Sequence, residues 1–143
     1  MPNVKDIMTK NVVTVGVNQT VSEAAELMAS NGVSCLIILE GEAPIGIVTE
    51  RDIVRRIVAQ KLSYETKTSE IMTNNLVTVD PDTSIKEAAR LMSTNNIRRL
   101  PVVKQNKLVG IVVAADFVRN LGKRTVAEEI LDAMGRYPSG TIS

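Results

Sequence analysis

Two stretches of this 143-residue chain decide its fold: DIMTKNVVTV at residues 6–15 and EIMTNNLVTV at residues 70–79. The second stretch repeats the first after 64 positions, and the likeness continues without a gap from residues 6–55 to residues 70–119. These 50 aligned pairs contain 20 identities, too many for chance. Because self-similarity at a fixed period indicates a repeated structural unit, the sequence predicts a duplicated unit of roughly 55–60 residues.

Each copy opens with a short extended segment, NVVTV or NLVTV, followed by a polar turn and a helix. A Ser/Thr-x-x-Glu capping box begins the helix, with Thr20 in copy one and Ser84 in copy two. The pairs Asn31-Gly32 and Asn95-Asn96 are predicted to end it, because Gly and Asn tolerate the left-handed conformation at a helix C-terminus. Helical spacing predicts this apolar face: Val21, Ala24, Ala25 and Met28, then Ile85, Ala88, Ala89 and Met92.

Two strands and a second helix complete each copy. The apolar runs SCLIILE and RRLPVVK are joined by short polar turns to PIGIVT and LVGIVV, which predicts two buried hairpins. A second helix begins near Asp52 and near Asp116, and Gly122 is expected to end the later one. Its predicted apolar residues are Ile53, Val54, Ile57 and Val58 in copy one, and Phe117, Val118 and Leu121 in copy two.

The predicted fold class is therefore mixed α/β (α+β), with two β-α-β-β-α repeats. One copy alone would bury little apolar surface, so we expect the two to pack face to face about a pseudo-twofold axis, which creates two equivalent clefts. The predicted boundaries are repeat 1 at 1–60, a polar linker at 61–69, repeat 2 at 70–122, and a C-terminal helix and tail at 123–143.

Composition excludes several classes of function. The net charge of +1, from 17 basic and 16 acidic residues, gives no reason to expect a nucleic acid or an acidic membrane as partner. The chain has no histidine and one cysteine, which excludes His/Cys zinc sites, Ser-His-Asp and Cys-His catalysis and intrachain disulfides, and no metal site is predicted. No apolar run has the length of a signal peptide or a membrane span, so we expect a soluble protein of the cytoplasm.

The sequence resembles a tandem pair of CBS domains, the cystathionine β-synthase motif, over about residues 4–122. The marks are DIMT and EIMT at the start of each copy, EAAxLM in each first helix, GIVTERD in copy one and RRLPVV in copy two. The resemblance implies a regulatory module without catalytic activity that commonly dimerises. It also implies an adenosine-containing ligand, namely AMP, ADP, ATP or an S-adenosylmethionine-like molecule.

In that family the ligand lies in a cleft between the copies, and a Gly-x-x-Thr/Ser-x-x-Asp motif holds the ribose. Gly46, Thr49 and Asp52 match this motif in full. A carboxylate can accept both vicinal ribose hydroxyls, arginine suits a phosphate, and Thr49 with the backbone N–H groups at the helix start could face the α-phosphate. The main site that the resemblance implies consists of Gly46, Ile47, Thr49, Asp52, Met72, Val77, Ile97, Arg98 and Arg99.

Copy two departs from the motif, since Val113 stands where copy one has Thr49. Its cleft keeps a carboxylate but loses the hydroxyl, and its wall has Ser34-Cys35 in place of Arg98-Arg99. We therefore expect a weaker second site that favours a less charged adenosine derivative. The residues implied for it are Met8, Val13, Val33, Ser34, Cys35, Ile111 and Asp116.

Plainer interpretations stay open for the same residues. Thr49 with Asp52 is also a good capping box, and helix capping alone explains both. Copy two nevertheless keeps Asp116 although the residue at the capping position is Val113, which suggests another task for the carboxylate. Arg98 and Arg99 could be an ordinary solvated pair, and Cys35 is expected to be a buried apolar residue.

Two functions are compatible with these observations. The first is a nucleotide sensor that passes on ligand occupancy through a homodimer or an effector protein. The alternative is a ligand-independent dimerisation or interaction module with vestigial clefts. Both include a homodimer, because VSEAAELM and DIVRRIVAQ carry more apolar residues than one sheet face needs. An enzyme is poorly supported, because the chain has no histidine and no activated nucleophile.

Overall fold

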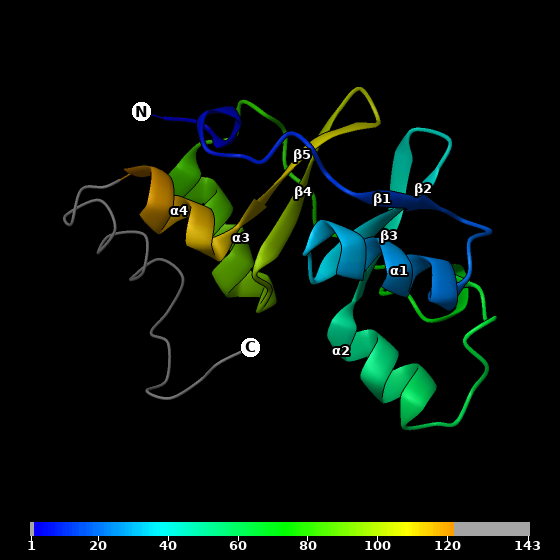
Figure 1. The fold of residues 1–143 in the computed structure, drawn as a ribbon. Helices are drawn as coiled ribbons and strands as arrows, with labels where there is room; N and C mark the ends of the chain where they lie inside the picture. Colours follow the sequence, from blue (N-terminus) through cyan, green and yellow to red (C-terminus); the bar gives the residue numbers. More distant parts are fainter. Residues whose placement is uncertain (1, 122–143) are drawn as a thin grey trace, which may run out of the picture. The chain divides into compact units, whose positions relative to one another are not determined.

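The computed structural model describes residues 2–121, so the predictions for Gly122 and for the helix and tail at 123–143 fall outside the described residues. Two compact units make up this part of the chain (Figure 1). The Asp52 unit comprises Asn11–Leu76 with Gln105–Leu108, and the Asp116 unit comprises residues 2–10, Val77–Lys104 and 109–121. The first ten residues thus group with the second copy of the repeat and not with their own.

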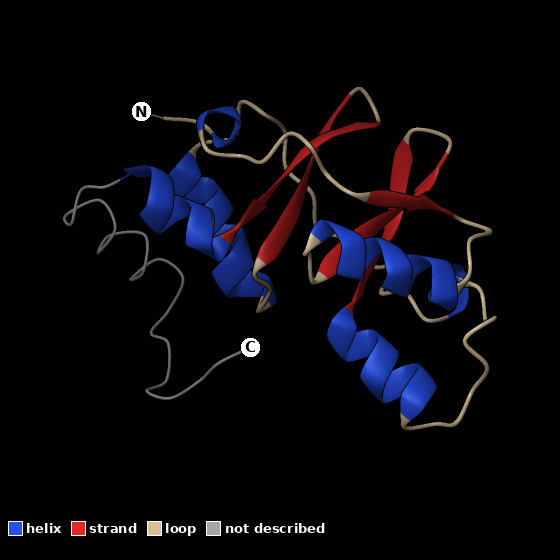
Figure 2. Ribbon diagram, in the orientation of Figure 1, coloured by secondary structure: helices blue, strands red, loops and turns tan. Residues whose placement is uncertain are grey.

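The Asp52 unit contains a three-stranded sheet, drawn in red in Figure 2, in the order β1-β2-β3. Strand β1 runs parallel to β2, and β3 runs antiparallel to it. Helix α1 packs against this sheet through Val21, Ala24 and Met28, all buried. The elements are β1 (Thr14–Gly16), α1 (Val21–Asn31), β2 (Cys35–Glu40), β3 (Ala43–Thr49), α2 (Glu50–Ile53) and a π-helical turn, Val54–Val58.

The Asp116 unit has a two-stranded sheet, β4-β5, and two helices. Its elements are α3 (Ile85–Asn95), β4 (Arg99–Lys104), β5 (Lys107–Val113) and α4 (Ala114–Leu121). Phe117, Leu100 and Met92 are fully buried in its core. Both predicted hairpins and both pairs of helices are confirmed. Among the described residues, no helix has the length and apolar character that crossing a bilayer requires.

The predicted first strand of copy two is wrong as a strand, because only an isolated parallel bridge, Val79 with Val102, forms there. In copy one the Ile37 N–H donates to the Val13 carbonyl at 3.4 Å, next to the β1-β2 ladder. The residue 64 positions after Ile37 is Pro101, which has no N–H to donate. The ladder of copy two is therefore one hydrogen bond shorter.

The predicted capping boxes form to different extents. At Thr20 both halves are present, because its hydroxyl accepts the Glu23 N–H and the Glu23 carboxylate accepts the Thr20 N–H. At Ser84 only the first half forms, since the Glu87 carboxylate is held by Arg90 instead. The C-terminal ends of α1 and α3 are as predicted, with Gly32 and Asn96 in the left-handed conformation at φ 63° and 53°.

The predicted apolar faces of the helices are only partly buried. Ile57 and Phe117 are in the cores, but Val54, Val58 and Val118 are 58%, 65% and 54% exposed. Ala25 is also exposed, whereas its counterpart Ala89 is fully buried. Among the described side chains, the second helices thus turn Val54, Val58 and Val118 to the surface, and the spacing alone did not distinguish these from the buried residues.

The polar segment before copy two packs along the start of α1. The Val21 N–H donates to the Thr66 carbonyl at 2.8 Å, and the Thr68 N–H donates to the Gln19 carbonyl at 2.9 Å. The same two bonds recur 64 residues away in the Asp116 unit, from Ile85 to Pro2 and from Val4 to Thr83. Each copy's opening segment is thus hydrogen-bonded into the unit that holds the other copy's strands and helices.

Candidate functional site

The glycine of each motif lies under the methionine that opens the other copy. A Cβ atom at Gly46 would come within 2.2 Å of the Met72 Sδ atom, and one at Gly110 within 2.7 Å of the Met8 Sδ atom. The residue after each glycine pairs with the opening segment: Ile47 with Thr73, and Ile111 with Thr9. Both glycines therefore have a packing role, because only a residue without Cβ allows this approach.

Thr49 and Asp52 form the turn between β3 and α2. The Asp52 Oδ2 atom accepts the Thr49 N–H at 2.9 Å and the Thr49 hydroxyl at 3.1 Å. The Thr49 hydroxyl oxygen in turn accepts the Asp52 N–H at 3.2 Å. The box fixes the rotamer of Asp52, so helix capping uses one of its two carboxylate oxygens.

The other oxygen of Asp52 is available. Among the described residues Oδ1 accepts no hydrogen bond, and the nearest cation is Arg56, whose Nε lies 3.8 Å away. The side chain of Asp52 is 16% exposed, so this oxygen is neither buried nor fully hydrated. A carboxylate oxygen placed in this way can accept hydrogen bonds from a ligand hydroxyl.

Asp116 occupies the same position in copy two but is committed to the protein. Its Oδ2 accepts the Val113 N–H at 2.8 Å, and its Oδ1 accepts a bond from Arg119 Nη1 at 3.0 Å. Its side chain is 2% exposed. The carboxylate thus has a structural task that does not need the hydroxyl missing at Val113, which explains why copy two keeps it.

The backbone at the start of α2 has little left for a phosphate. The Thr49 N–H donates to Asp52, the Glu50 N–H donates to the Ser34 carbonyl at 2.9 Å, and the Asp52 N–H donates to Thr49. These groups are the donors that the sequence suggested for an α-phosphate. These three N–H groups therefore already have acceptors within the protein.

The two units divide the predicted site residues between them. The Asp52 unit brings together Gly46, Ile47, Thr49, Asp52 and Met72 of the main site, and also holds Val13, Val33, Ser34 and Cys35. The Asp116 unit brings together Met8, Ile111 and Asp116 of the second site, and also holds Val77, Ile97, Arg98 and Arg99. Each unit therefore contains one motif glycine, its methionine and its carboxylate.

The hairpin register places two residues of the predicted second site beside Thr49. Cys35 is the strand partner of Thr49, and the Ser34 carbonyl accepts the Glu50 N–H. Cys35 is half-buried, so the expectation of a buried apolar cysteine is wrong: the residue begins β2 at the end of the sheet next to the α2 turn. The antiparallel hairpin predicted from the sequence could already have indicated that Cys35, at the start of one strand, lies opposite Thr49, at the end of the other.

Arg56 is a further residue at this turn that the sequence analysis did not single out. It follows Asp52 by four residues, the spacing at which side chains on a helix meet, and this spacing could have indicated it. Its Nη1 donates to the Ile71 carbonyl at 2.8 Å. The guanidinium therefore lies between Asp52 and the segment that carries Met72.

The clear pKa shifts among the described groups lie outside these motifs. A hydrogen bond and ion pair with Asp82 raise the pKa of Lys5 and lower that of Asp82, and the bond to Arg90 lowers the pKa of Glu87. Both pairs are exposed at the surface of the Asp116 unit. Within residues 2–121, no three His, Cys, Asp or Glu side chains gather as a metal site would need.

Comparison with known proteins agrees with these features. A sequence model of the CBS domain matches the chain twice, at residues 4–59 and 69–123. The CBS domain-containing protein YhcV of Bacillus subtilis is 44% identical over 120 residues, which cover 84% of this chain and 86% of that protein.

Solved structures of CBS proteins are similar as well. The CBS domain protein PAE2072 of Pyrobaculum aerophilum, complexed with AMP, superposes with a TM-score of 0.78 at 27% identity, covering 91% of this chain and 98% of that one. The CBS domain pair of protein MJ0100, in complex with 5-methylthioadenosine and S-adenosyl-L-methionine, gives a TM-score of 0.74 at 33% identity, covering 85% and 97%. The chain belongs to the CBS domain family and carries a tandem pair of these domains.

Proposed function

We propose that this protein is a regulatory module that binds an adenosine-containing ligand and has no catalytic activity of its own. The observation that carries the proposal is the Asp52 carboxylate, one oxygen of which is fixed by Thr49 while the other accepts no hydrogen bond in the described structure. A rigid carboxylate, 16% exposed and with one oxygen that accepts no hydrogen bond in the described structure, suits the hydroxyls of a ribose.

The residues around Asp52 are suited to the rest of a nucleoside. Met72 is half-buried over Gly46, and a flexible thioether adapts its shape to a flat ring. Adenosine ligands occupy the related pairs PAE2072 and MJ0100, which supports this ligand class. We propose AMP, ADP, ATP or an S-adenosylmethionine-like molecule as the candidates.

Four residues of the Asp116 unit complete the proposal. Val77 and Ile97 would contact the adenine, and Arg98 and Arg99 would contact phosphate, which a guanidinium binds in a bidentate manner. The case for arginine is supported by the start of α2, where three of the backbone N–H groups already have acceptors within the protein.

The proposal ranks the second site lower. Asp116 is buried and bound by Val113 and Arg119, so a ligand would have to displace a protein hydrogen bond to reach it. We propose that Asp116 serves mainly as a structural cap and that a second adenosine ligand, if bound there, is weakly held.

The first experiment identifies the ligand. Mass spectrometry of small molecules released from the purified protein is expected to show an adenosine compound. Calorimetry then ranks AMP, ATP, S-adenosylmethionine and methylthioadenosine on the ligand-free protein. Absence of binding by all four would contradict the proposed function.

Substitutions then assign the residues. Asp52→Ala is expected to weaken binding by roughly 1.5–3 kcal/mol, the magnitude of a charge-assisted hydrogen bond, while Asp116→Ala affects AMP much less. Arg99→Ala is expected to weaken AMP binding and to leave adenosine binding nearly unchanged. An equal loss for both ligands would remove Arg99 from any phosphate role.

A second function, protein association, is favoured by the surface of the Asp52 unit. A groove of about 390 Å³ lies between α1 and the turn after α2 and is lined by Val21, Ser22, Ala25, Ile53, Ile57, Val58, Lys61, Leu62 and Tyr64. Val58, Leu62 and Tyr64 are 65%, 51% and 67% exposed. Apolar side chains gathered on a surface in this way favour a protein partner, and we propose that the partner is a second copy of this chain. We also propose that the protein is cytoplasmic.

Light scattering tests the dimer with and without AMP. We expect a mass near twice 15.5 kDa, and Val58→Glu is expected to lower it toward the monomer. A mass near 15.5 kDa for the unmodified protein would contradict the homodimer. A dimer that binds none of the adenosine ligands would favour the ligand-independent interaction module.

A further inference from the structure

The helix that follows Asp52 contains a π-helical turn, Val54–Val58. The Ala59 N–H donates to the Val54 carbonyl at 2.8 Å, five residues back, where an α-helix would use the residue four back. In copy two the corresponding α4 is a regular α-helix over its described length. Single π-helical turns are rare and are often found at functional sites.

Arg56 lies in the middle of this turn and has two contacts. Its Nη1 donates to the Ile71 carbonyl at 2.8 Å, and its Nε lies 3.8 Å from Asp52 Oδ1. Ile71 is buried, and it precedes Met72, the residue that covers Gly46. One planar guanidinium with several donors thus connects the segment that carries Met72 to the helix that carries Asp52.

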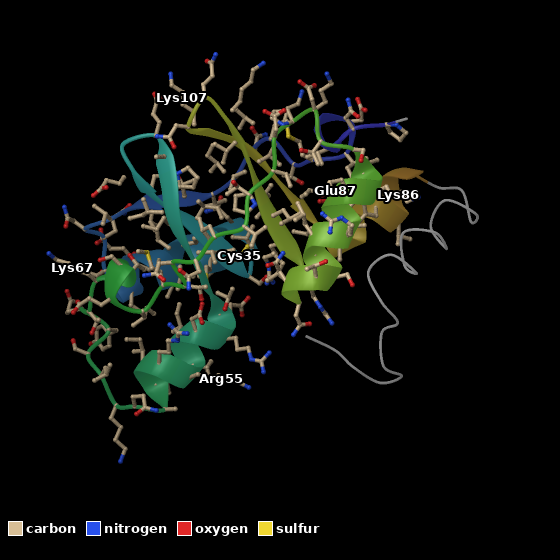
Figure 3. All side chains as sticks on the ribbon, turned by 180° about the vertical axis from the view of Figure 1, so that it is seen from behind. Cys35, Arg55, Lys67, Lys86, Glu87 and Lys107 are labelled. Atoms are coloured by element: carbon tan, nitrogen blue, oxygen red, sulfur yellow. The ribbon has the colours of Figure 1, made fainter. Side chains whose placement is uncertain are left out.

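Copy two has a different residue at the position of Arg56. The residue 64 positions after Arg56 is Asn120, and the arginine that binds Asp116 is Arg119, the counterpart of Arg55. Arg55, labelled in Figure 3, is exposed on the same helical segment as Arg56. In copy one, therefore, a single arginine contacts both the motif carboxylate and the opening segment beside it.

The remaining contacts of that segment show what Arg56 adds. The Met72 N–H donates to the Thr68 carbonyl at 3.0 Å, and Thr73 exchanges two hydrogen bonds with Ile47, at 2.9 and 3.0 Å. The Ile71 N–H also donates to the Thr68 carbonyl, at 3.1 Å, and Arg56 binds the Ile71 carbonyl, which belongs to the same peptide as the Met72 N–H. The segment is thereby held on both sides of the methionine.

We propose that Arg56 is a positioning residue that secures the Ile71–Thr73 segment against β3 and so fixes Met72 over Gly46 for the ligand. The ligand part of this inference rests on the proposed function. The ion pair at 3.8 Å is too long to be a hydrogen bond, so it does not occupy Asp52 Oδ1, and Thr49 holds the carboxylate. Loss of Arg56 therefore weakens ligand binding through Met72 and leaves the carboxylate in place.

The test compares the variant Arg56→Gln with the variant Arg55→Gln. Arg55 is the neighbouring arginine, so its variant is a control with the same change of charge and of helix propensity. NMR measures the amide hydrogen exchange of the full ligand-free chain. In Arg56→Gln we expect the amides of Met72 and Thr73 to exchange about fivefold faster, since the hydrogen bond from the half-exposed Arg56 guanidinium to the Ile71 carbonyl is lost. Amides in α1 are expected to exchange at the unmodified rate in both variants.

Calorimetry with AMP provides the second reading. We expect Arg56→Gln to bind AMP about fivefold more weakly, because it lacks the hydrogen bond from Arg56 to the Ile71 carbonyl. Arg55→Gln is expected to bind AMP with the affinity of the unmodified protein. Arg56→Lys, which can still donate one bond to Ile71, is expected to recover part of both effects.

Each outcome decides the proposal. Unchanged exchange at Met72 and Thr73 in Arg56→Gln would overturn it, as would faster exchange spread equally over α1, which would indicate a general loss of stability. Faster local exchange with unchanged AMP affinity would overturn the ligand part. If the unmodified protein does not bind AMP, the proposed function fails for that ligand and the positioning role fails with it, while the exchange data separately confirm or overturn the restraint.

Discussion

Asp52 and Asp116 stand at equivalent positions of the two copies, yet their surroundings differ. Asp52 closes a capping box with Thr49, is 16% exposed, and has an oxygen 3.8 Å from the nearest arginine. Asp116 is 2% exposed, accepts the Val113 N–H and binds Arg119 at 3.0 Å. The same carboxylate can therefore serve a ligand in one copy and the fold in the other.

The difference shows how duplication separates two tasks that a single motif combines. In copy one the Thr49 N–H and the Thr49 hydroxyl both donate to Oδ2 of Asp52, so the cap uses only that oxygen. In copy two, where a valine replaces the threonine, both oxygens of Asp116 are used by the protein. The bond from Arg119 to Oδ1 thus distinguishes Asp116 from Asp52, whose Oδ1 lies 3.8 Å from the Nε of Arg56.

The largest effect is expected from removing the two carboxylates. Asp116→Ala should lower the free energy of unfolding by about 2–3 kcal/mol, because the partly buried Val113 N–H loses its acceptor and Arg119 loses its partner. Asp52→Ala should lower it by about 1 kcal/mol, the usual loss for a helix cap. Urea denaturation measures both values, and equal losses would break the comparison.

Alanine at the two motif glycines is expected to give the next largest effect. At Gly110 the new Cβ would lie 2.9 Å from the Thr9 carbonyl oxygen, a backbone atom, whereas at Gly46 the closest atoms belong to the flexible Met72 side chain. We expect a loss of about 2 kcal/mol for Gly110→Ala and about 1 kcal/mol for Gly46→Ala. Thermal unfolding with matched baselines measures the order, and the reverse order would show that Met72 cannot move.

The missing hydrogen bond in copy two allows a smaller test. Pro101→Ile restores the N–H that its counterpart Ile37 donates in copy one. The new amide at position 101 is expected to donate to Val77 and to be protected from exchange, with a stability change within about 1 kcal/mol. A fully unprotected amide would show that something other than proline shortens this strand.

The smallest effect on stability is expected from the Glu87–Arg90 ion pair, which replaces the second hydrogen bond of the capping box at Ser84. The bond to Arg90 lowers the pKa of Glu87 below its ordinary value of 4.5, so the pair stabilises the fold above that pH and its contribution disappears as the pH falls through the lowered value. Arg90→Ala is expected to have a slightly lower melting temperature than the unmodified protein at neutral pH and the same melting temperature at low pH. A melting difference that persists in acid would contradict this assignment.

Much of the fold could be predicted from the repeat. The spacing of apolar residues gives both hairpins and the first helix of each copy, and Gly32 and Asn96 end those helices as predicted. The loss of the strand at Val79 was also readable, since Pro101 lies where a donor is needed. These features depend on local chemistry, which the sequence contains directly.

Other features depend on competition and long-range packing. The sequence gives no means to choose between the Ser84 N–H and Arg90 as partner of Glu87, or to foresee the π-helical turn at Val54–Val58. The bond from Arg56 to Ile71 joins residues 15 apart, so no helical pattern indicates it. The burial of Asp116 beside an exposed Arg119 likewise follows from packing and not from the motif.

Calorimetry with AMP and its 2′-deoxy analogue tests the central claim most directly, namely that Asp52 and not Asp116 receives the ribose hydroxyls. We expect the unmodified protein to prefer AMP by about tenfold, the effect of one hydrogen bond to a charged group. Asp52→Asn is expected to lose that preference, because the amide replaces one carboxylate oxygen, and Asp116→Asn is expected to keep it. A preference that survives in Asp52→Asn, or disappears in Asp116→Asn, would contradict the assignment.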